Sequence, residues 1–276
     1  MSDFDYTGKR VIVTGGATGV GAALLDLLAE LGAPAVTVLD LKEPSGPHET
    51  FLQTDLSDRA AVDAAAARIE GPIDALFNNA GVADTLPAET VFRVNVLAPI
   101  HLTKALLPQV VDGGAVAVTA SIAGMAWKER MAAIQELLAL DDWDAMFEWF
   151  DGRELGVDTY SFTKEVMQVW TMRFAATARA AGVRINSVCP SPIDTPLMGD
   201  FRKTIGDAGL DFTIQHAGGR MCSPREVASA LAFLNSPAAA FVSGQNMNVD
   251  FGFEASIITR TLDTSAARAA VGRASR

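Results

Sequence analysis

The stretch "TGGATGVG", from Thr14 to Gly21, decides the fold. It continues the apolar, strand-like run "RVIVT" and leads into "VGAALLDLLAELG", whose apolar spacing is that of a helix. In a turn of this kind, Gly15 allows the tight bend, Gly19 allows close approach to the backbone, and the last glycine lets helix and strand pack together. The N-terminus of the helix then faces a pyrophosphate. The stretch therefore predicts a nucleotide-binding strand–turn–helix unit.

Asp40 lies at the end of the second predicted strand, "AVTVLD". An acidic residue about 20 positions after the glycine turn hydrogen-bonds the adenosine ribose hydroxyls and repels a 2′-phosphate. We therefore predict that the cofactor is NAD rather than NADP. The alternative is that Asp40 is a plain turn residue, since any turn between a strand and a helix can be rich in glycine.

Short apolar runs alternate with longer helical runs along the rest of the chain. Further strands are expected at "IDALFNNAG", "GAVAVTAS", "VRINSVCP" and "GQNMNVD", and helices at residues 57–70, 89–107, 159–181 and 223–236, with Ser57 and Ser223 as N-caps. Strands that are apolar on both faces predict a parallel sheet covered by helices on both sides. The expected fold class is therefore α/β.

No internal repeat and no linker marks a second domain in the sequence. One domain is expected over residues 1–255. Residues 256–276 are small and polar, and we expect a flexible tail or a segment that lies on a neighbouring subunit.

Composition and charge exclude several classes of protein. The 276 residues carry a formal charge of −11, which argues against nucleic acid or an anionic membrane as a main partner. No apolar run reaches the roughly 18 residues of a membrane span, and the start "MSDFDYTGKR" lacks the apolar segment of a signal peptide. Cys189 and Cys222 make no disulfide framework, and the three histidines have no metal-ligand spacing. We expect a cytoplasmic protein without a metal.

Tyr160 is one of only two tyrosines in the chain, and Lys164 follows it four residues later in a predicted helix. Residues at this spacing share a helix face, and a nearby cation lowers the pKa of a phenol. A tyrosine tuned toward the working pH can give or take a proton. A single Y-x-x-x-K is more often a surface tyrosine beside a lysine stem, so other motifs must decide.

Seven motifs occur in one order along residues 8–252. They are "TGGATGVG", Asp55-Leu56, Asn78-Asn79-Ala80-Gly81, Asn95, Ser121, Tyr160-x-x-x-Lys164 and Pro190-x-x-Ile193-x-Thr195. In this order they resemble the motifs of the short-chain dehydrogenase/reductases. The resemblance implies a single-domain Rossmann fold with a doubly wound, seven-stranded parallel sheet in the order 3-2-1-4-5-6-7.

The resemblance also implies roles for individual residues. Tyr160 is the expected catalytic acid/base, and Lys164 binds the nicotinamide ribose and lowers the phenol pKa. Ser121 hydrogen-bonds the substrate oxygen, and Asn95 holds a water in the proton relay. The alternatives are that Ser121 only ends a strand and that Asn95 is a buried polar residue tying two strands. The expected cofactor contacts are Gly15, Thr18, Gly19, Val20, Gly21, Asp40, Leu41, Asp55, Leu56, Asn79, Ala80, Gly81, Tyr160, Lys164, Pro190, Ile193 and Thr195.

The chain departs from the family pattern in four places. Ser191 stands where the family usually has glycine, and Asp250-Phe251-Gly252 stands in place of Asp-Gly-Gly. The segment from Gly81 to Asn95 is short, so the helix between them should be nearly absent. The segment between Ser121 and the catalytic tyrosine is long.

That long segment contains a helical insert at about residues 127–157. It is expected to form two short helices joined near Asp141. It resembles the insert of the bacterial 3α-hydroxysteroid dehydrogenase/carbonyl reductase branch, which is similar to coniferyl-alcohol dehydrogenases. In that branch the insert sits over the active site and alters the helix pair used for tetramers, so a homodimer or a homotetramer is expected. The predicted substrate lid is Trp127, Met131, Trp143 and Phe147, and the alternative is that the insert only packs on its own core or on a partner.

These features together predict an NAD-dependent oxidoreductase. It would interconvert a secondary or allylic alcohol and its carbonyl on a small-molecule substrate that is hydrophobic and bulky, such as a hydroxysteroid, terpenoid or aryl-propanoid alcohol. One alternative is a sugar-nucleotide epimerase, which the short segment after Thr195 disfavours. Another is a catalytically silent NAD-binding regulator, which the intact Ser121, Tyr160 and Lys164 set disfavours.

Overall fold

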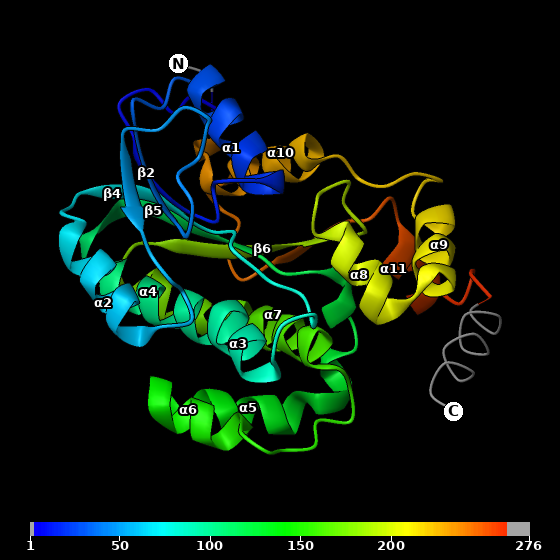
Figure 1. Ribbon diagram of the computed structural model, residues 1–276. Coiled ribbons are helices and arrows are strands. Elements are labelled where there is room, and N and C mark those ends of the chain that lie inside the picture. The colour runs from blue at the N-terminus through cyan, green and yellow to red at the C-terminus, as the bar shows by residue number, and fades with distance from the viewer. Residues whose placement is uncertain (1–2, 264–276) are drawn as a thin grey trace.

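The computed structural model describes residues 3–263 and is built around a parallel sheet of seven strands (Figure 1). The strand order β3-β2-β1-β4-β5-β6-β7 confirms the predicted order. The strands are β1 Arg10–Thr14, β2 Ala35–Asp40, β3 Thr50–Gln53, β4 Ile73–Asn78, β5 Val110–Thr119, β6 Arg184–Pro190 and β7 Asn246–Val249. Because all strands run the same way, their carboxyl ends lie along one edge of the sheet.

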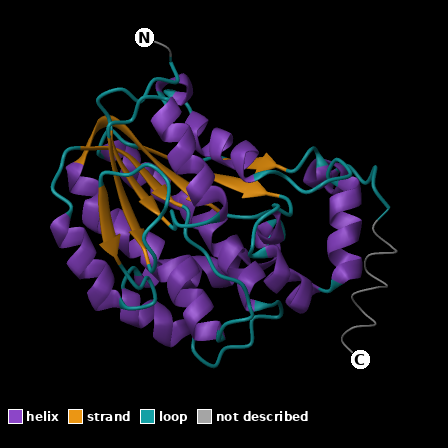
Figure 2. Ribbon diagram, turned by 45° about the horizontal axis from the view of Figure 1, so that its top comes forward, coloured by secondary structure: helices purple, strands orange, loops and turns teal. Residues whose placement is uncertain are grey.

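Helices cover both faces of the sheet, and the strands lie between them in both views (Figures 1 and 2). On one face α1 (Gly19–Glu30) and α10 (Pro224–Asn235) pack with β1 and β4 around an apolar core. On the other face lie α2 (Arg59–Arg68), α4 (Ala98–Leu106) and α7 (Thr159–Ala180), with a second core beneath them. The predicted doubly wound α/β fold is therefore present.

Helix starts follow the capping residues, with one difference from the sequence expectation. Ser223 caps α10 and forms a reciprocal capping box with Glu226, as its place before Pro224 suggested. The helix expected at 57–70 begins at Arg59 instead, because Asp58 is the cap and accepts a hydrogen bond from the Ala60 N–H. The side chain of Ser57 donates to Asp55 instead.

The predicted helix 89–107 is interrupted by a turn of π-helix. The short helix α3 (Ala88–Phe92) leads into a π-helical segment, Arg93–Leu97, before α4 begins. The five residues of α3 agree with the expectation that little helix fits between Gly81 and Asn95. Single π-helical turns are often found at functional sites, and this one contains Asn95.

The insert forms α5 (Met131–Leu140) and α6 (Trp143–Phe150), and Asp141 joins them in a left-handed backbone conformation. The two helices lie outside α3 and α7 and form a further layer on the face of the sheet that α7 covers (Figure 1). The ring of Phe150 stacks on Phe92 with 4.0 Å between centroids. The two predicted helices are thus confirmed, but they face the α3–α7 layer.

Three helices were not predicted from the sequence. α8 (Met198–Ile205) and α9 (Asp207–His216) stand beyond the carboxyl end of β6, and α11 (Phe253–Ile258) lies beside them (Figure 1). α11 crosses residue 256, where the tail was expected to start, and residues 264–276 of that tail lie outside the described residues. No helix within residues 3–263 is both long and apolar enough to cross a membrane.

Candidate active site

A cavity of about 740 Å³ opens at the carboxyl ends of the central strands, between them and the α8–α9 segment. We call it the cleft. Every predicted cofactor residue except Gly21 lines it, and so do Ser121, Tyr160 and Lys164. Residues from distant parts of the sequence meet here because many of them follow strands whose carboxyl ends lie along one edge of the sheet, and α7, α8 and α9 bring the others.

The glycine turn leaves no room for a side chain at Gly15 or Gly21. A Cβ added at Gly21 would lie 1.8 Å from the carbonyl oxygen of Gly15, and one added at Gly15 would lie 2.6 Å from the Cα of Ala80. Gly15 also has a φ of +72°, a backbone conformation that favours glycine. The turn, the start of α1 and the loop after β4 therefore form a close-fitting backbone cradle, which suits a dinucleotide pyrophosphate.

Asp40 is both a turn residue and a residue of the cleft. One carboxylate oxygen accepts a hydrogen bond from the Ala17 N–H at 3.0 Å, and the other accepts from the Lys42 N–H at 3.2 Å. These bonds fix the carboxylate at the end of β2, next to the exposed Leu41. A fixed negative charge at this point faces the space where an adenosine ribose would lie.

Tyr160 lies in the first turn of α7, and Lys164 lies one turn further on. The Lys164 Nζ donates to the Thr119 carbonyl oxygen at 2.9 Å and lies 5.4 Å from the centroid of the Tyr160 ring. Ser121 follows β5, accepts from the Ala123 N–H at 3.1 Å and lines the same cleft as Tyr160. Three of the four side chains predicted to be catalytic, Ser121, Tyr160 and Lys164, are thus brought together in the cleft.

Burial dominates the electrostatics of this trio. It raises the pKa of Tyr160 well above its usual value, while the hydrogen bond from Ser121 lowers it and the charges of Asp158 and Asp84 raise it. Burial also lowers the pKa of Lys164 to about 8. The expected lowering of the phenol pKa by Lys164 is therefore not the net effect in this structure.

Asn95 does not line the cleft but holds its wall in place. Its Oδ1 accepts from the Val82 N–H and its Nδ2 donates to the Val82 carbonyl oxygen, both at 2.9 Å. Its Nδ2 also lies 3.3 Å from the Thr163 Oγ1 on α7. Asn95 is a buried polar tie, as the alternative held, although it joins a loop and a helix rather than two strands. Its role in a proton relay stays a prediction.

The substrate-lid prediction is corrected by the structure, because none of Trp127, Met131, Trp143 and Phe147 lines the cleft. Trp143 belongs to the apolar core that continues from the α4–α7 layer into the insert, and Trp127, Met131 and Phe147 pack against that core. Trp143 is buried, and the ring of Phe147 lies 4.2 Å from the guanidinium carbon of Arg93. The apolar face of the insert is thus covered by the body of the protein, the alternative that the sequence left open.

The outer wall of the cleft comes instead from residues that the sequence analysis missed. They are Met125, Met198, Phe201, Ile205, Leu210, Phe212, Phe253 and Ile257. The Phe201 ring approaches the Tyr160 ring edge-on, with 4.8 Å between centroids. A signal existed, since Met198, Phe201 and Ile205 have the spacing of one helix face.

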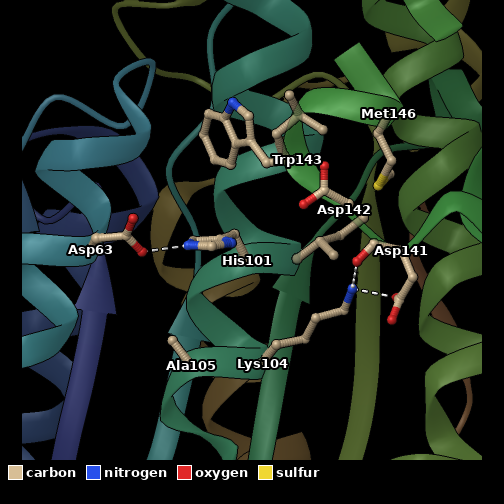
Figure 3. Close-up of a pocket in the computed structure, with 10 residues that line it drawn as sticks. Asp63, His101, Lys104, Ala105, Asp141, Asp142, Trp143 and Met146 are labelled. Carbon is tan, nitrogen blue, oxygen red and sulfur yellow. Dashed lines mark hydrogen bonds and ion pairs between the residues drawn. The ribbon is translucent and has the colours of Figure 1, made fainter. Parts of the chain in front are cut away.

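A smaller hollow of about 370 Å³ lies between α4 and the start of α6 (Figure 3). Four of its polar side chains form two pairs: His101 with Asp63 at 2.6 Å, and Lys104 with Asp141. No group of side chains suited to a metal ion occurs within the described part of the chain. The Lys104–Asp141 pair ties the insert to α4 at this hollow.

Comparison with known proteins agrees with this geometry. Two family models match the chain, "short chain dehydrogenase" over residues 9–133 and "Enoyl-(Acyl carrier protein) reductase" over residues 153–254. Coniferyl-alcohol dehydrogenase from a Pseudomonas species (strain HR199) is 29% identical over 254 residues, which cover 91% of this chain and 99% of that protein. Cis-4-hydroxycyclohexanecarboxylate dehydrogenase from Sinomonas cyclohexanicum is 32% identical over 265 residues, covering 91% and 98%.

A solved structure of similar fold also comes from an alcohol-type dehydrogenase. The 3-alpha-hydroxysteroid dehydrogenase from Pseudomonas sp. B-0831, complexed with NADH, has a TM-score of 0.78 at 28% identity. The match covers 92% of this chain and 100% of that chain. The resemblance seen in the motifs is confirmed, including both branches that the insert suggested. The chain belongs to the short-chain dehydrogenase/reductase family and is an oxidoreductase of that family.

Proposed function

We propose that the chain interconverts a secondary or allylic alcohol and its carbonyl, with NAD as cofactor, on a substrate with an apolar ring system. The observation that carries the proposal is the meeting of Ser121, Tyr160 and Lys164 in one cleft. Its outer wall is made largely of aromatic and aliphatic side chains from α8, α9 and α11. A positioned proton donor beside an apolar surface suits an uncharged alcohol or ketone.

The residues of the chain divide the work of the reaction. Ser121 and Tyr160 hold the substrate oxygen between their hydroxyl groups, and Tyr160 takes the hydroxyl proton during oxidation or returns it during reduction. Lys164, a buried amine beside the tyrosine ring, favours the phenolate that forms when the proton leaves. The chemistry that NAD supplies when bound is the acceptance and return of hydride.

The preference for NAD over NADP rests on Asp40. Its carboxylate is held by two backbone N–H groups and lines the cleft, so it cannot turn away from a 2′-phosphate without losing both bonds. Repulsion between the carboxylate and a phosphate would disfavour NADP. The similar hydroxysteroid dehydrogenase was solved with NADH, which agrees with this choice.

The proposed substrate class follows from the outer wall. Met125, Phe201 and Phe212 come from three separate segments and present apolar surface to the same cavity. The names of the similar proteins refer to coniferyl alcohol, a hydroxycyclohexane acid and a hydroxysteroid, all of which are ring compounds. We therefore place terpenoid, steroid and aryl-propanoid alcohols first among the candidates.

We further propose a homodimer in the cytoplasm. The insert covers the outer side of α7 and is tied to α4 through Lys104 and Asp141. We expect this cover to disturb the helix pairing that the family resemblance implies for tetramers. Phe241, which lies between α10 and β7 in the sequence, is fully exposed and could contribute to a dimer interface. Cys189 and Cys222 are free thiols, as is usual in a reducing compartment.

The test is a panel of ring alcohols and ketones assayed with NAD(H) and NADP(H), followed by the absorbance of the reduced nicotinamide. Small polar alcohols serve as the comparison group. We expect turnover of at least one ring alcohol with NAD and poor turnover of the small alcohols. Turnover restricted to small polar alcohols would refute the substrate class, and light scattering that shows a stable monomer would refute the dimer.

A further inference from the structure

Two carboxyl groups meet beside the backbone of the catalytic tyrosine. Asp84 lies in the loop after β4, and one of its oxygens accepts a hydrogen bond from the Tyr160 N–H at 3.0 Å. Asp158 is the last residue before α7 and caps that helix by accepting from the Ser161 N–H at 2.8 Å. The two carboxyl groups therefore bind neighbouring N–H groups at the start of α7, and the hydrogen bond and charge of Asp158 raise the pKa of Asp84.

The second oxygen of Asp84 shows that this contact needs a proton. That Oδ1 is buried, and among residues 3–263 it finds no hydrogen-bond donor. The Asp158 carboxyl, which accepts from the next N–H group of α7, is a polar group that can reach this oxygen when one proton is shared. Two ionised carboxylates in such a contact repel, whereas one proton between them gives a hydrogen bond and satisfies the buried oxygen.

We propose that Asp84 and Asp158 share one proton and that this bond makes Asp84 a positioning residue for Tyr160. The inference rests on the proposed function, since it concerns the proton donor of that reaction. Neither carboxyl group lines the cleft, so both act through the backbone of the first turn of α7. Asp84 satisfies one of the N–H groups that a helix leaves unpaired at its start.

The pair also joins the two walls of the active site. The loop that carries Asp84 contains Gly81 and Val82, which line the cleft, and Asn95 holds the same loop from the other side. With the proton in place, the loop is fastened to the catalytic helix at Asp158 and at Tyr160. Without it, only the bond to the Tyr160 N–H remains, and the facing charges push the loop away from the helix.

The pH at which the proton leaves follows from the surroundings. Burial raises the pKa of Asp84 to about 6; the bond from the Tyr160 N–H opposes this, and the hydrogen bond and charge of Asp158 add to it. The other ionisable groups near the pair are the Tyr160 phenol and, beyond Asp158, Arg130 and Glu165, which are paired with each other. The pKa of Asp84 is thus higher in the folded protein than in the unfolded chain, where it is about 4. The stabilisation from the shared proton is therefore complete below about pH 4 and is lost as the pH rises through about 6.

The decisive variant is Asp84→Asn, because an amide imitates the protonated carboxyl. Its oxygen can accept from the Tyr160 N–H while its NH₂ donates to Asp158 at every pH. Asp84→Ala removes both bonds. Glu89→Gln, an exposed carboxylate on α3, is the matched control for loss of a charge near the same loop.

Two measurements across pH 5 to 8 test the proposal: the Tm without substrate, and kcat and kcat/KM for a ring alcohol. As the pH rises past about 6, we expect Asp84→Asn to gain on the wild type in both measurements. The difference in Tm should grow in favour of the variant, and the ratio of its kcat to the wild-type kcat should rise by about threefold or more. Asp84→Ala should lose about 10- to 100-fold in kcat, the cost of a misplaced catalytic group. Glu89→Gln should follow the wild type at each pH.

Each contrary result has its own meaning. A constant ratio between Asp84→Asn and the wild type across this pH range would overturn the shared proton. A wild-type kcat in Asp84→Ala would overturn the positioning role. If the Tm behaves as expected but no alcohol is turned over by the wild type, the shared proton stands, and the positioning role falls together with the proposed function.

Discussion

Arg130 of the insert forms an ion pair with the buried Glu165 of α7. The Glu165 side chain is 0% exposed, and the Arg130 Nε lies 2.5 Å from one of its oxygens while a second guanidinium nitrogen binds the other. Glu165 follows directly after Lys164 in α7. The pair therefore fastens the insert to the helix that carries the active site.

Removing one partner of this pair should be costly. Arg130→Ala leaves a buried carboxylate without a cation, so we expect the free energy of unfolding to fall by about 3–5 kcal/mol. Arg225→Ala breaks an exposed ion pair with Glu30 and is the matched control, with an expected loss below about 1 kcal/mol. Urea unfolding of both variants measures the difference. Equal losses would show that the buried pair does not anchor the insert.

Tyr160→Phe keeps the ring and removes the proton donor. We expect kcat to fall by about 10²–10⁴-fold, the usual contribution of a positioned acid/base, while NADH binding changes little. The control is Tyr6→Phe, since Tyr6 is the other tyrosine and donates to the Ala232 carbonyl oxygen at 2.8 Å, far from the cleft. That variant should lose about 1 kcal/mol of stability and no activity. Wild-type turnover in Tyr160→Phe would rule it out as the acid/base.

The cofactor preference can be shifted at the end of β2. Asp40→Ser combined with Leu41→Arg removes the fixed charge and adds a guanidinium that can bind a 2′-phosphate. We expect kcat/KM to move toward NADPH in the double variant, and Leu41→Arg alone to move it less. Steady-state kinetics with both cofactors measures this. A wild-type enzyme that already prefers NADPH would show that the role given to Asp40 is wrong.

The sheet order and most of the cleft could be predicted because they depend on local chemistry. The glycine turn, Asp40, Ser121 and the tyrosine–lysine spacing each follow from one strand or one helix. A parallel sheet then brings the strand ends together without further information. The predicted cap of α2 is one residue too early because Ser57 and Asp58 are both good caps, and only the structure shows that the Asp58 side chain binds the Ala60 N–H.

The position of the insert and the identity of the outer wall of the cleft could not be predicted from the sequence. Trp143 and Phe147 had to be buried by substrate, by a partner or by the protein itself, and sequence spacing does not distinguish these. α8 and α9 carry their apolar residues toward an open cleft rather than a core, and they are short and rich in charged residues, so they resembled a loop. The Asp84–Asp158 contact joins a loop to a helix and leaves no periodic pattern.

The corrected position of the insert leads to the last prediction. Phe201 lines the cleft and touches the ring of Tyr160, whereas Trp143 is buried against the helical layer. Phe201→Ala should therefore raise KM for a ring alcohol by about tenfold, from the loss of about 1.5 kcal/mol of apolar contact, with little change in KM for NAD. Trp143→Ala should lower the free energy of unfolding by about 3–5 kcal/mol and leave both KM values unchanged. Steady-state kinetics and urea unfolding of the two variants separate these effects. A rise in substrate KM confined to Trp143→Ala would restore the insert as the substrate lid and remove that role from α8.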